Sequence, residues 1–331
     1  MITAEQLRDL TELNDFKSAK AVTINFATCA LAICTGLWAG THNVWWLLVV
    51  AVLFLATQQH GLFVLSHEAA HYRLFNSRFL NEGIGRFIGT VGGTSMCTYR
   101  VTHRLHHNHL YERRDPDIAL NGGYPRGKWY LYKKLLIDLS GWTAPKTYAY
   151  FFGAPAINKE NPKAGKPLDS ATTKLKADAR KDRWWVLAFH VGMPITMFAF
   201  GGLTALGWYF VLWILPLVTL LQAILRLRAV AEHGAPLSLA PNSKGEHSSL
   251  TAARTNLSDR GVLGAVQKLV FFPHHVNYHI EHHLYPAVPH YNLPKLHTLL
   301  QSQGALERAD VRTFSSTMKR VFQERTQETT Q

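Results

Sequence analysis

Residues 21–66, AVTINFATCALAICTGLWAGTHNVWWLLVVAVLFLATQQHGLFVLS, contain no Lys, Arg, Asp or Glu. An α-helix rises about 1.5 Å per residue and must cross roughly 30 Å of hydrocarbon, so about 20 apolar residues make one crossing. The stretch is therefore long enough for two crossings. Residues 40–43 lie between Trp38 and Trp45, and tryptophan is enriched where a helix meets the membrane surface. The pattern predicts a hairpin of two transmembrane helices.

A second uncharged stretch, residues 184–225, predicts another hairpin with Gly201-Gly202 at its turn. Neither turn carries a charge, so all 35 Lys and Arg residues fall on the side of both termini, which the positive-inside rule makes cytoplasmic. We expect an all-α integral membrane protein with four transmembrane helices, although two buried hairpins of a soluble protein are an alternative. The expected divisions are one domain over residues 1–331, membrane hairpins at 21–66 and 184–225, and a cytosolic helical cap formed by 67–183 and 226–331.

Composition and charge narrow the functional classes. The formal net charge is +13, but no nucleic-acid motif accompanies it, and Lys and Arg beside crossings already follow from topology and anionic lipid. We therefore expect a membrane and no nucleic acid as partner. The polar residues 1–20 do not look like a cleavable signal. The three cysteines have no metal-ligand spacing and imply no disulfide.

Segments of the expected cap have local patterns of their own. Residues 87–98 are apolar and rich in Gly but too short to cross, which fits a re-entrant or surface segment. Residues 154–183 are dominated by Pro, Gly, Lys, Asp and Ser and predict a mobile loop, and two short helices are expected after Val262. One face of an expected interfacial helix carries Trp129, Tyr132, Leu136 and Leu139.

Polar residues inside the second crossing are costly and therefore informative. Gln58, Gln59 and His60 either line a pocket or hydrogen-bond between helices. We expect a narrow apolar groove bounded by the second and fourth crossings. Both crossings are followed at once by histidines, so each helix would carry them out of the bilayer on a cytoplasmic extension.

Nine of the 18 histidines gather in four short stretches. The stretches are His67-Glu-Ala-Ala-His71, His103-Arg-Leu-His106-His107, Glu232-His233 and His279-Ile-Glu-His282-His283. Spacings of three and four residues place side chains on one face of a helix, so each stretch can aim its imidazoles at one point. Neutral imidazole suits zinc, copper, iron and nickel, and nine nitrogens exceed what one ion can hold. The sequence thus predicts two metal ions.

The other histidines do not share this pattern. His109, His274 and His275 sit beside the stretches but off their spacing, and their role is open. The isolated ones are interpreted as ordinary polar groups: His42, His60, His190, His247, His290 and His297.

The histidine stretches and two hydrophobic hairpins resemble the membrane fatty acid desaturase and hydroxylase superfamily over nearly the whole chain. Asp115-Pro-Asp117 follows the second stretch, as in acyl-lipid, sphingolipid and carotenoid branches of that superfamily. The stretch His279–His283 lies within NYHIEHHLYP at residues 277–286, with Leu293-Pro294 beyond. This segment looks most like the bacterial acyl desaturase branch.

The resemblance implies a non-haem di-iron centre that activates dioxygen with two electrons from a separate ferredoxin-like or cytochrome-like donor. It implies a lipid or acyl substrate and favours iron over zinc, because zinc is redox-inert. The implied ligands are His67, His71, His103, His106, His107, His233, His279, His282 and His283. Acidic residues expected behind the ligands are Glu68, Asp115, Asp117, Glu232 and Glu281.

Three rival functions remain on this evidence. A hydroxylase or ketolase of a lipid or carotenoid would use the same di-iron site. His67-Glu68-Ala-Ala-His71 also satisfies the HExxH pattern of zinc proteases, which leaves the other clusters unexplained. A metal transporter should carry ionisable residues within its crossings, yet both uncharged stretches lack acidic residues.

Overall fold

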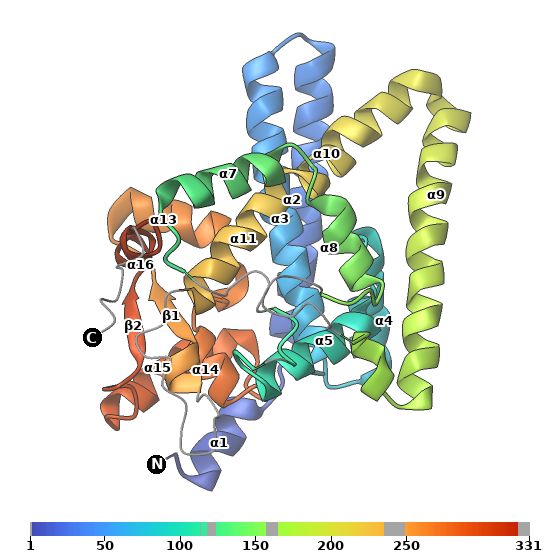
Figure 1. Ribbon diagram of the computed structural model, residues 1–331. Helices are drawn as coiled ribbons and strands as arrows, with labels where there is room; N and C mark the ends of the chain where they lie inside the picture. Colours follow the sequence, from blue (N-terminus) through green and yellow to red (C-terminus); the bar gives the residue numbers. More distant parts are fainter. Residues whose placement is uncertain (1, 113, 118–123, 157–164, 235–248, 324–331) are drawn as a thin grey trace.

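The computed structural model describes residues 2–112, 114–117, 124–156, 165–234 and 249–323. Its N-terminal part is the expected hairpin, in which α2 (Asp15–Thr41) and α3 (Trp45–Ala70) follow a short helix α1 (Ala4–Thr11). The turn falls at Asn43, whose φ of 59° is the left-handed conformation that asparagine tolerates. The two helices run side by side and rise from the rest of the molecule (Figure 1).

The second apolar stretch is more continuous than we expected. Helix α9 (Thr173–Tyr209) is followed by a π-helical turn η2 (Phe210–Ile214), by α10 (Leu215–Val218) and by α11 (Leu220–His233). The expected turn at Gly201-Gly202 is a kink, because only Gly202 departs from helical geometry, with φ 61°. Beyond the kink the chain returns toward the bundle through α10 (Figure 1).

Three helical segments among the described residues are long and apolar enough to cross a membrane. They are Ala4–Thr41, Trp45–Ala70 and Thr173–His233. The third segment contains both crossings that the sequence predicted separately, because the helical backbone resumes directly after the kink.

A pair of helices follows the first hairpin. Helix α4 (Arg78–Val91) packs against α3, and α5 (Met96–Asn108) carries the second histidine stretch. Phe87 of α4 lies 5.8 Å from Phe26 of α2, centroid to centroid, so this helix reaches the level of the first crossing. The apolar residues 87–98 therefore form the end of α4, a turn and the start of α5.

Two further helices, α7 (Lys128–Leu139) and α8 (Ala144–Phe151), lie against the bundle. Helix α7 has the apolar outer face that its sequence predicts: Trp129 is 72% and Leu136 68% exposed, whereas Leu131 is buried. The prediction of a mobile loop over residues 154–183 is wrong for its second half. A 3₁₀ turn, η1 (Pro167–Ser170), precedes α9, which starts at Thr173. Thr172 caps that helix, and Lys, Leu and Ala favour helix there. Residues 157–164 lie outside the described part.

The C-terminal part is richer than the two short helices we expected. Strands β1 (Arg254–Leu257) and β2 (Asp310–Thr313) form a parallel two-stranded sheet, so the fold is mostly but not purely helical. Arg254 pairs with Asp310 at 2.7 Å, both buried, which ties the strands together. The other elements are α12 (Ser249–Ala252), α13 (Gly261–Val270), η3 (Pro273–His275), α14 (His279–Leu284), η4 (His290–Asn292), α15 (Leu293–Ser302) and α16 (Phe314–Val321).

Candidate metal centre

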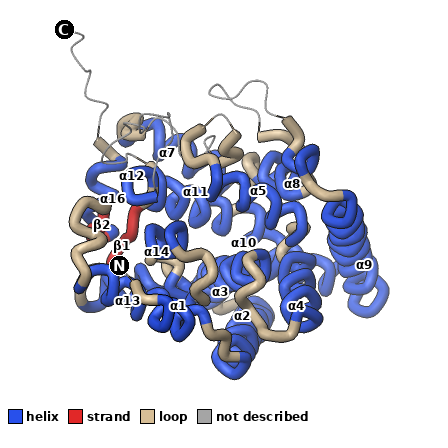
Figure 2. The backbone as a smooth tube through the Cα atoms, turned by 90° about the horizontal axis from the view of Figure 1, so that it is seen from below, coloured by secondary structure: helices blue, strands red, loops and turns tan. Residues whose placement is uncertain are grey.

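Four helices from distant parts of the chain bring the histidine stretches together. The C-terminal end of α3, the helix α5, the last residue of α11 and the short helix α14 each contribute, and these elements surround the centre of the molecule when it is viewed from below (Figure 2). Eight of the nine histidines predicted as ligands lie in two adjoining groups, and the ninth, His107, adjoins the first group.

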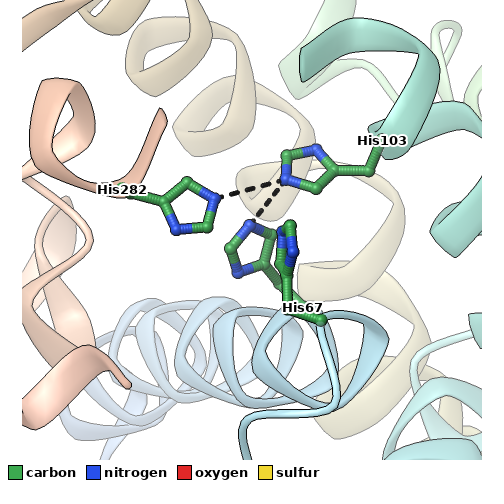
Figure 3. A group of neighbouring side chains, drawn as sticks. His67, His103 and His282 are labelled. Carbon is green, nitrogen blue, oxygen red and sulfur yellow. Dashed lines mark hydrogen bonds between the residues drawn. The ribbon is translucent and has the colours of Figure 1, made fainter. Parts of the chain in front are cut away.

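The first group, cluster A, consists of His67, His71, His103 and His282, with one ring nitrogen of each within 4.8 Å of the others. The Nε2 atoms of His67 and His103 are 2.8 Å apart, and those of His103 and His282 are 3.5 Å apart (Figure 3). His107 adjoins this cluster, because its Nε2 lies 2.9 Å from that of His103 and 3.1 Å from that of His282.

The second group, cluster B, consists of His106, His233, His279 and His283. His233 stands between its neighbours: its Nε2 lies 3.0 Å from that of His106 and 2.7 Å from that of His279. The ring of His107 stacks on His283 at 4.1 Å, so the two clusters adjoin across this pair.

The spacing of the ring nitrogens fits metal coordination. Imidazole nitrogens bind first-row metals at about 2.1 Å, which places neighbouring ligands roughly 3.0–3.4 Å from one another in octahedral or tetrahedral geometry. The measured separations of 2.7–3.5 Å lie close to that range. In addition, Nε2 of His71 is buried without a hydrogen-bond partner among the described residues. Such an atom is costly to bury unless it binds something.

Hydrogen bonds on the opposite ring nitrogens orient two of the candidate ligands. Nδ1 of His106 lies 2.9 Å from Oδ1 of Asp115, and Nδ1 of His233 lies 2.9 Å from the carbonyl oxygen of Ala252. With the proton on Nδ1, each ring presents the lone pair of Nε2 to cluster B. Outer partners of this kind fix the tautomer of metal-binding histidines.

The remaining acidic residues that we predicted behind the ligands have different contacts. Glu68 lies 3.4 Å from Nδ1 of His67, and Glu232 lies 3.8 Å from Nε2 of His279. Asp117 lies 3.7 Å from Nδ1 of His106. Glu281 instead binds Thr255 and Nδ1 of His297, both at 2.5 Å, and thereby joins α14 to β1 and α15.

Burial keeps most of the histidines in the form that binds metal. It lowers the pKa of His103, His282 and His283 well below the usual range, and neighbouring histidines act in the same direction. His106 differs: burial lowers its pKa, but the charge and hydrogen bond of Asp115 outweigh burial and raise it to about 9. Neutral imidazole is the ligand, so metal binding at His106 must displace a proton.

The described histidines beyond the four stretches lie outside both clusters, and His247 lies outside the described part of the chain. His109 binds Glu112 at 2.8 Å, and His274 lies 3.0 Å from Oδ1 of Asn25. His60 has its Nδ1 2.9 Å from the carbonyl oxygen of Val270. His275 is part-buried next to Tyr278.

Two residues that our sequence reasoning did not single out contact the site. The ring of Tyr99 stacks on His103 at 5.2 Å between centroids, with its hydroxyl 3.5 Å from Nδ1. Arg228, buried near the end of α11, binds Glu232 at 2.7 Å. Arg228 could have been found from the sequence, because it is a charged residue shortly after an apolar crossing. Tyr99 could not, because its contact with His103 depends on packing.

A small, mostly apolar cavity lies beside Ser66, the residue that precedes His67, and none of the clustered histidines lines it. It lies between α3, α4 and the chain from η2 to α11, so both the second and the fourth predicted crossing contribute to its wall. Gln59 lies in its wall: its Nε2 donates to the carbonyl oxygen of Trp213 at 2.9 Å. Gln58 instead faces α2, where it accepts a bond from Thr28. The lining residues are Gln59, Leu62, Phe63, Ser66, Ile88, Gly89, Gly92, Thr94, Trp213, Leu217 and Leu221.

The known proteins that this chain resembles in sequence include several desaturases. The chain is 27% identical over 297 residues to a dihydrorhizobitoxine desaturase of Bradyrhizobium elkanii, which covers 87% of this chain and 77% of that protein. It is 24% identical to an acyl-lipid (9+3)-(E)-desaturase of Dimorphotheca sinuata, over 70% of this chain and 60% of that one. An endoplasmic-reticulum acyl-lipid omega-3 desaturase (cytochrome b5) of Arabidopsis thaliana is 27% identical over 70% of this chain and 58% of its own length.

The model of one protein family matches residues 43–315, most of the chain, and this range includes both histidine clusters and the cavity beside them. The chain is therefore an oxidoreductase that belongs to the fatty acid desaturase family.

Proposed function

We propose that this protein is an oxygen-dependent acyl desaturase with a di-iron centre held by its nine clustered histidines. The observation that carries the proposal is the convergence of ring nitrogens from four helices into two adjoining clusters, A and B. Cluster A, with His107, would hold one ion and cluster B the other. The similarity to desaturases from bacteria and plants supports this reading of the site.

Two iron ions bound there would supply the redox chemistry that activates dioxygen with two electrons from a separate donor. The residues of this chain hold and orient the reactants. Asp115 and the carbonyl of Ala252 keep His106 and His233 in the required tautomer. The small apolar cavity beside Phe63 and Ser66 would widen, as its lining side chains move apart, to admit an acyl chain next to His67 and keep water away from it.

The net reaction removes two hydrogen atoms from adjacent carbons of the substrate. These hydrogens, two electrons and two further protons reduce one dioxygen molecule to two water molecules. After the first hydrogen is lost, removal of the neighbouring hydrogen gives an alkene, whereas addition of oxygen gives an alcohol. The position of the chain against the site thus decides between desaturation and hydroxylation or ketolation, the alternative for this family.

For the membrane topology we propose four crossings in one domain that spans the whole chain. The kink at Gly202 would divide the long third segment into two crossings, and the exposed aromatic face of α7 would lie at the membrane surface. Both termini and the clusters would then be cytoplasmic, where a ferredoxin-like or cytochrome-like protein can reach them.

The proposal is tested with purified protein, acyl substrates, a reducing system and ¹⁸O-labelled dioxygen. Desaturation gives a product that is lighter by two hydrogens and carries no label. Labelled oxygen in the main product would instead assign the chain to the hydroxylases or ketolases. Metal analysis separates these from a zinc protease, since a di-iron enzyme contains iron and the HExxH reading requires one zinc.

A further inference from the structure

The nine clustered histidines differ in their exposure to solvent. Seven are buried, whereas His71 and His107 keep part of their surface exposed. His71 belongs to cluster A, and His107 adjoins it through contacts with His103 and His282. The metal centre therefore comes closest to the protein surface at these two rings.

Arginines lie near His71 and on the same face of α5 as His107. Positions 100, 104 and 107 share one face of α5, because a helix has about 3.6 residues per turn. Burial lowers the pKa of His71 to about 4, and the charges of Arg100 and Arg73 act on it in the same direction. We call Arg73, Arg78, Arg100 and Arg104 the arginine rim.

Tyr72, the neighbour of His71 in the chain, holds the rim together. Its ring lies between two guanidinium groups, with the central carbon of Arg78 3.3 Å and that of Arg100 3.9 Å from the ring centroid. Cations over an aromatic face are attracted by its quadrupole. The backbone of Tyr72 has φ 62°, an uncommon conformation for a residue with a side chain. The chain thus holds an aromatic ring between positive charges directly beside a candidate ligand.

The rim carries more positive charge than its neighbours balance. Glu82 lies 2.7 Å from Arg100 and 3.8 Å from Arg78, and it also contacts Arg86 at 3.3 Å. Asp178 and Asp182 contact Arg86 rather than the rim. Arg100 also donates hydrogen bonds to the carbonyl oxygens of Ala69 and Ala70 and thereby caps α3. These bonds account for the position of the Arg100 side chain, so no partner protein is needed to explain it. Arg78 and Arg104 are exposed, and Arg78 contacts Tyr72 and Glu82 from the surface.

We propose that the arginine rim is the docking site of the electron donor, a small acidic one-electron carrier protein that delivers its electrons at the edges of His71 and His107. The inference rests on the proposed function, because it assumes a reducible metal centre. Each docking event oxidises the donor by one electron and reduces the centre by one electron. Two events supply the pair that one turnover consumes. Complementary charge of this kind chiefly raises the rate of encounter.

The test uses the full-length iron-loaded protein in lipid nanodiscs and two probes, a reduced plant-type [2Fe–2S] ferredoxin and the soluble haem domain of cytochrome b5. Donor oxidation is followed by stopped flow for the wild type and for Arg78→Glu/Arg104→Glu. We expect the double variant to be slower by about tenfold or more at low ionic strength. The difference should shrink at about 1 M salt, where the screening length is roughly 3 Å.

Two controls make the outcome decisive. Arg308→Glu reverses an exposed charge in the segment between α15 and β2, away from α4 and α5 in Figure 1, and should leave donor oxidation unchanged. Iron content and reduction by dithionite should be equal in all variants. Equal rates for wild type and double variant, an equal loss in Arg308→Glu, or no oxidation of either probe by a dithionite-reducible wild type would overturn the docking site. Normal rim-dependent oxidation without any acyl product would instead refute the proposed function.

Discussion

Asp115 and His106 form a buried pair in which the carboxylate lies 2.9 Å from Nδ1 of the ring, and Nε2 of the same ring faces His233 at 3.0 Å. The pair lies at the end of α5, and its carboxylate also accepts the backbone N–H groups of Tyr111 and Asp117. Asp115 therefore links the fold of the loop after α5 to the orientation of one candidate ligand.

Replacing Asp115 with Asn should weaken metal binding at cluster B. The amide keeps the size of the side chain but removes the charge that fixes the proton on Nδ1, and losses of about 10- to 100-fold in metal affinity are typical of such changes. Iron retained during dialysis against a chelator measures the effect. Asp169→Asn, near the start of α9, is the control and should retain iron as the wild type does.

Single ligand substitutions should separate the two clusters. His282→Ala removes a nitrogen from cluster A, and His283→Ala removes one from cluster B. Each variant should lose iron and activity, while spectroscopy of the residual iron should report a different remaining site in the two cases. His109→Ala, outside both clusters, should retain full iron. Wild-type iron and turnover in His282→Ala would exclude the proposed ligand set.

The composition of the site could be predicted from sequence because helical spacing is a local property. His103, His106 and His107 necessarily share a sector of α5, and uncharged stretches of sufficient length necessarily predict membrane helices. Which stretch meets which was not predictable, since the pairing of His106 with His233 depends on the path of the whole chain. The division into clusters A and B is likewise a tertiary property.

The errors of prediction also have physical causes. The predicted turn at Gly201-Gly202 coincides with the break at Gly202, but no loop separates the helical segments, because glycine permits a kink as readily as a loop. Residues 173–183 looked like a loop because of their polarity, yet they are good helix formers whose Asp182 pairs with Arg86. Adjacency to His282 suggested a role for Glu281 at the metal site, but neighbours on a helix point in different directions, and Glu281 faces Thr255.

Arg228→Met should destabilise the protein more than most substitutions. Arg228 and Glu232 form a buried ion pair at 2.7 Å, and removing one partner of such a pair typically costs about 3–5 kcal/mol because the other charge stays buried. Thermal unfolding in detergent measures the loss. The double variant Arg228→Met/Glu232→Leu should recover much of the stability, since no unpaired charge remains. A single variant as stable as the double variant would contradict this account.

The proposed topology predicts the accessibility of single cysteines. In a background with exposed Cys34 replaced by Ser, cysteines placed at Asn43 and Thr204 should react with a membrane-impermeant reagent added outside intact cells. A cysteine at Lys174, at the start of α9, should react only after the membrane is opened. All three positions are exposed in the fold, so a failure to react would reflect the membrane rather than burial. The opposite labelling pattern would invert the topology.

Substrate selection should respond to the cavity between α3 and α11. Leu221 lines it, and Leu221→Trp would fill space that we assign to the acyl chain. We expect a loss of activity that is larger for long acyl chains than for short ones, because added volume first excludes the chain that extends furthest along the groove. Iron content should not change, since Leu221 lies outside both clusters. Overpacking itself costs about 1–3 kcal/mol, so unfolding must be measured alongside. Leu187→Trp on the exposed face of α9 is the matched control and should keep the wild-type preference for chain length. A uniform loss of activity for all chain lengths in Leu221→Trp, with stability preserved, would place the acyl chain elsewhere.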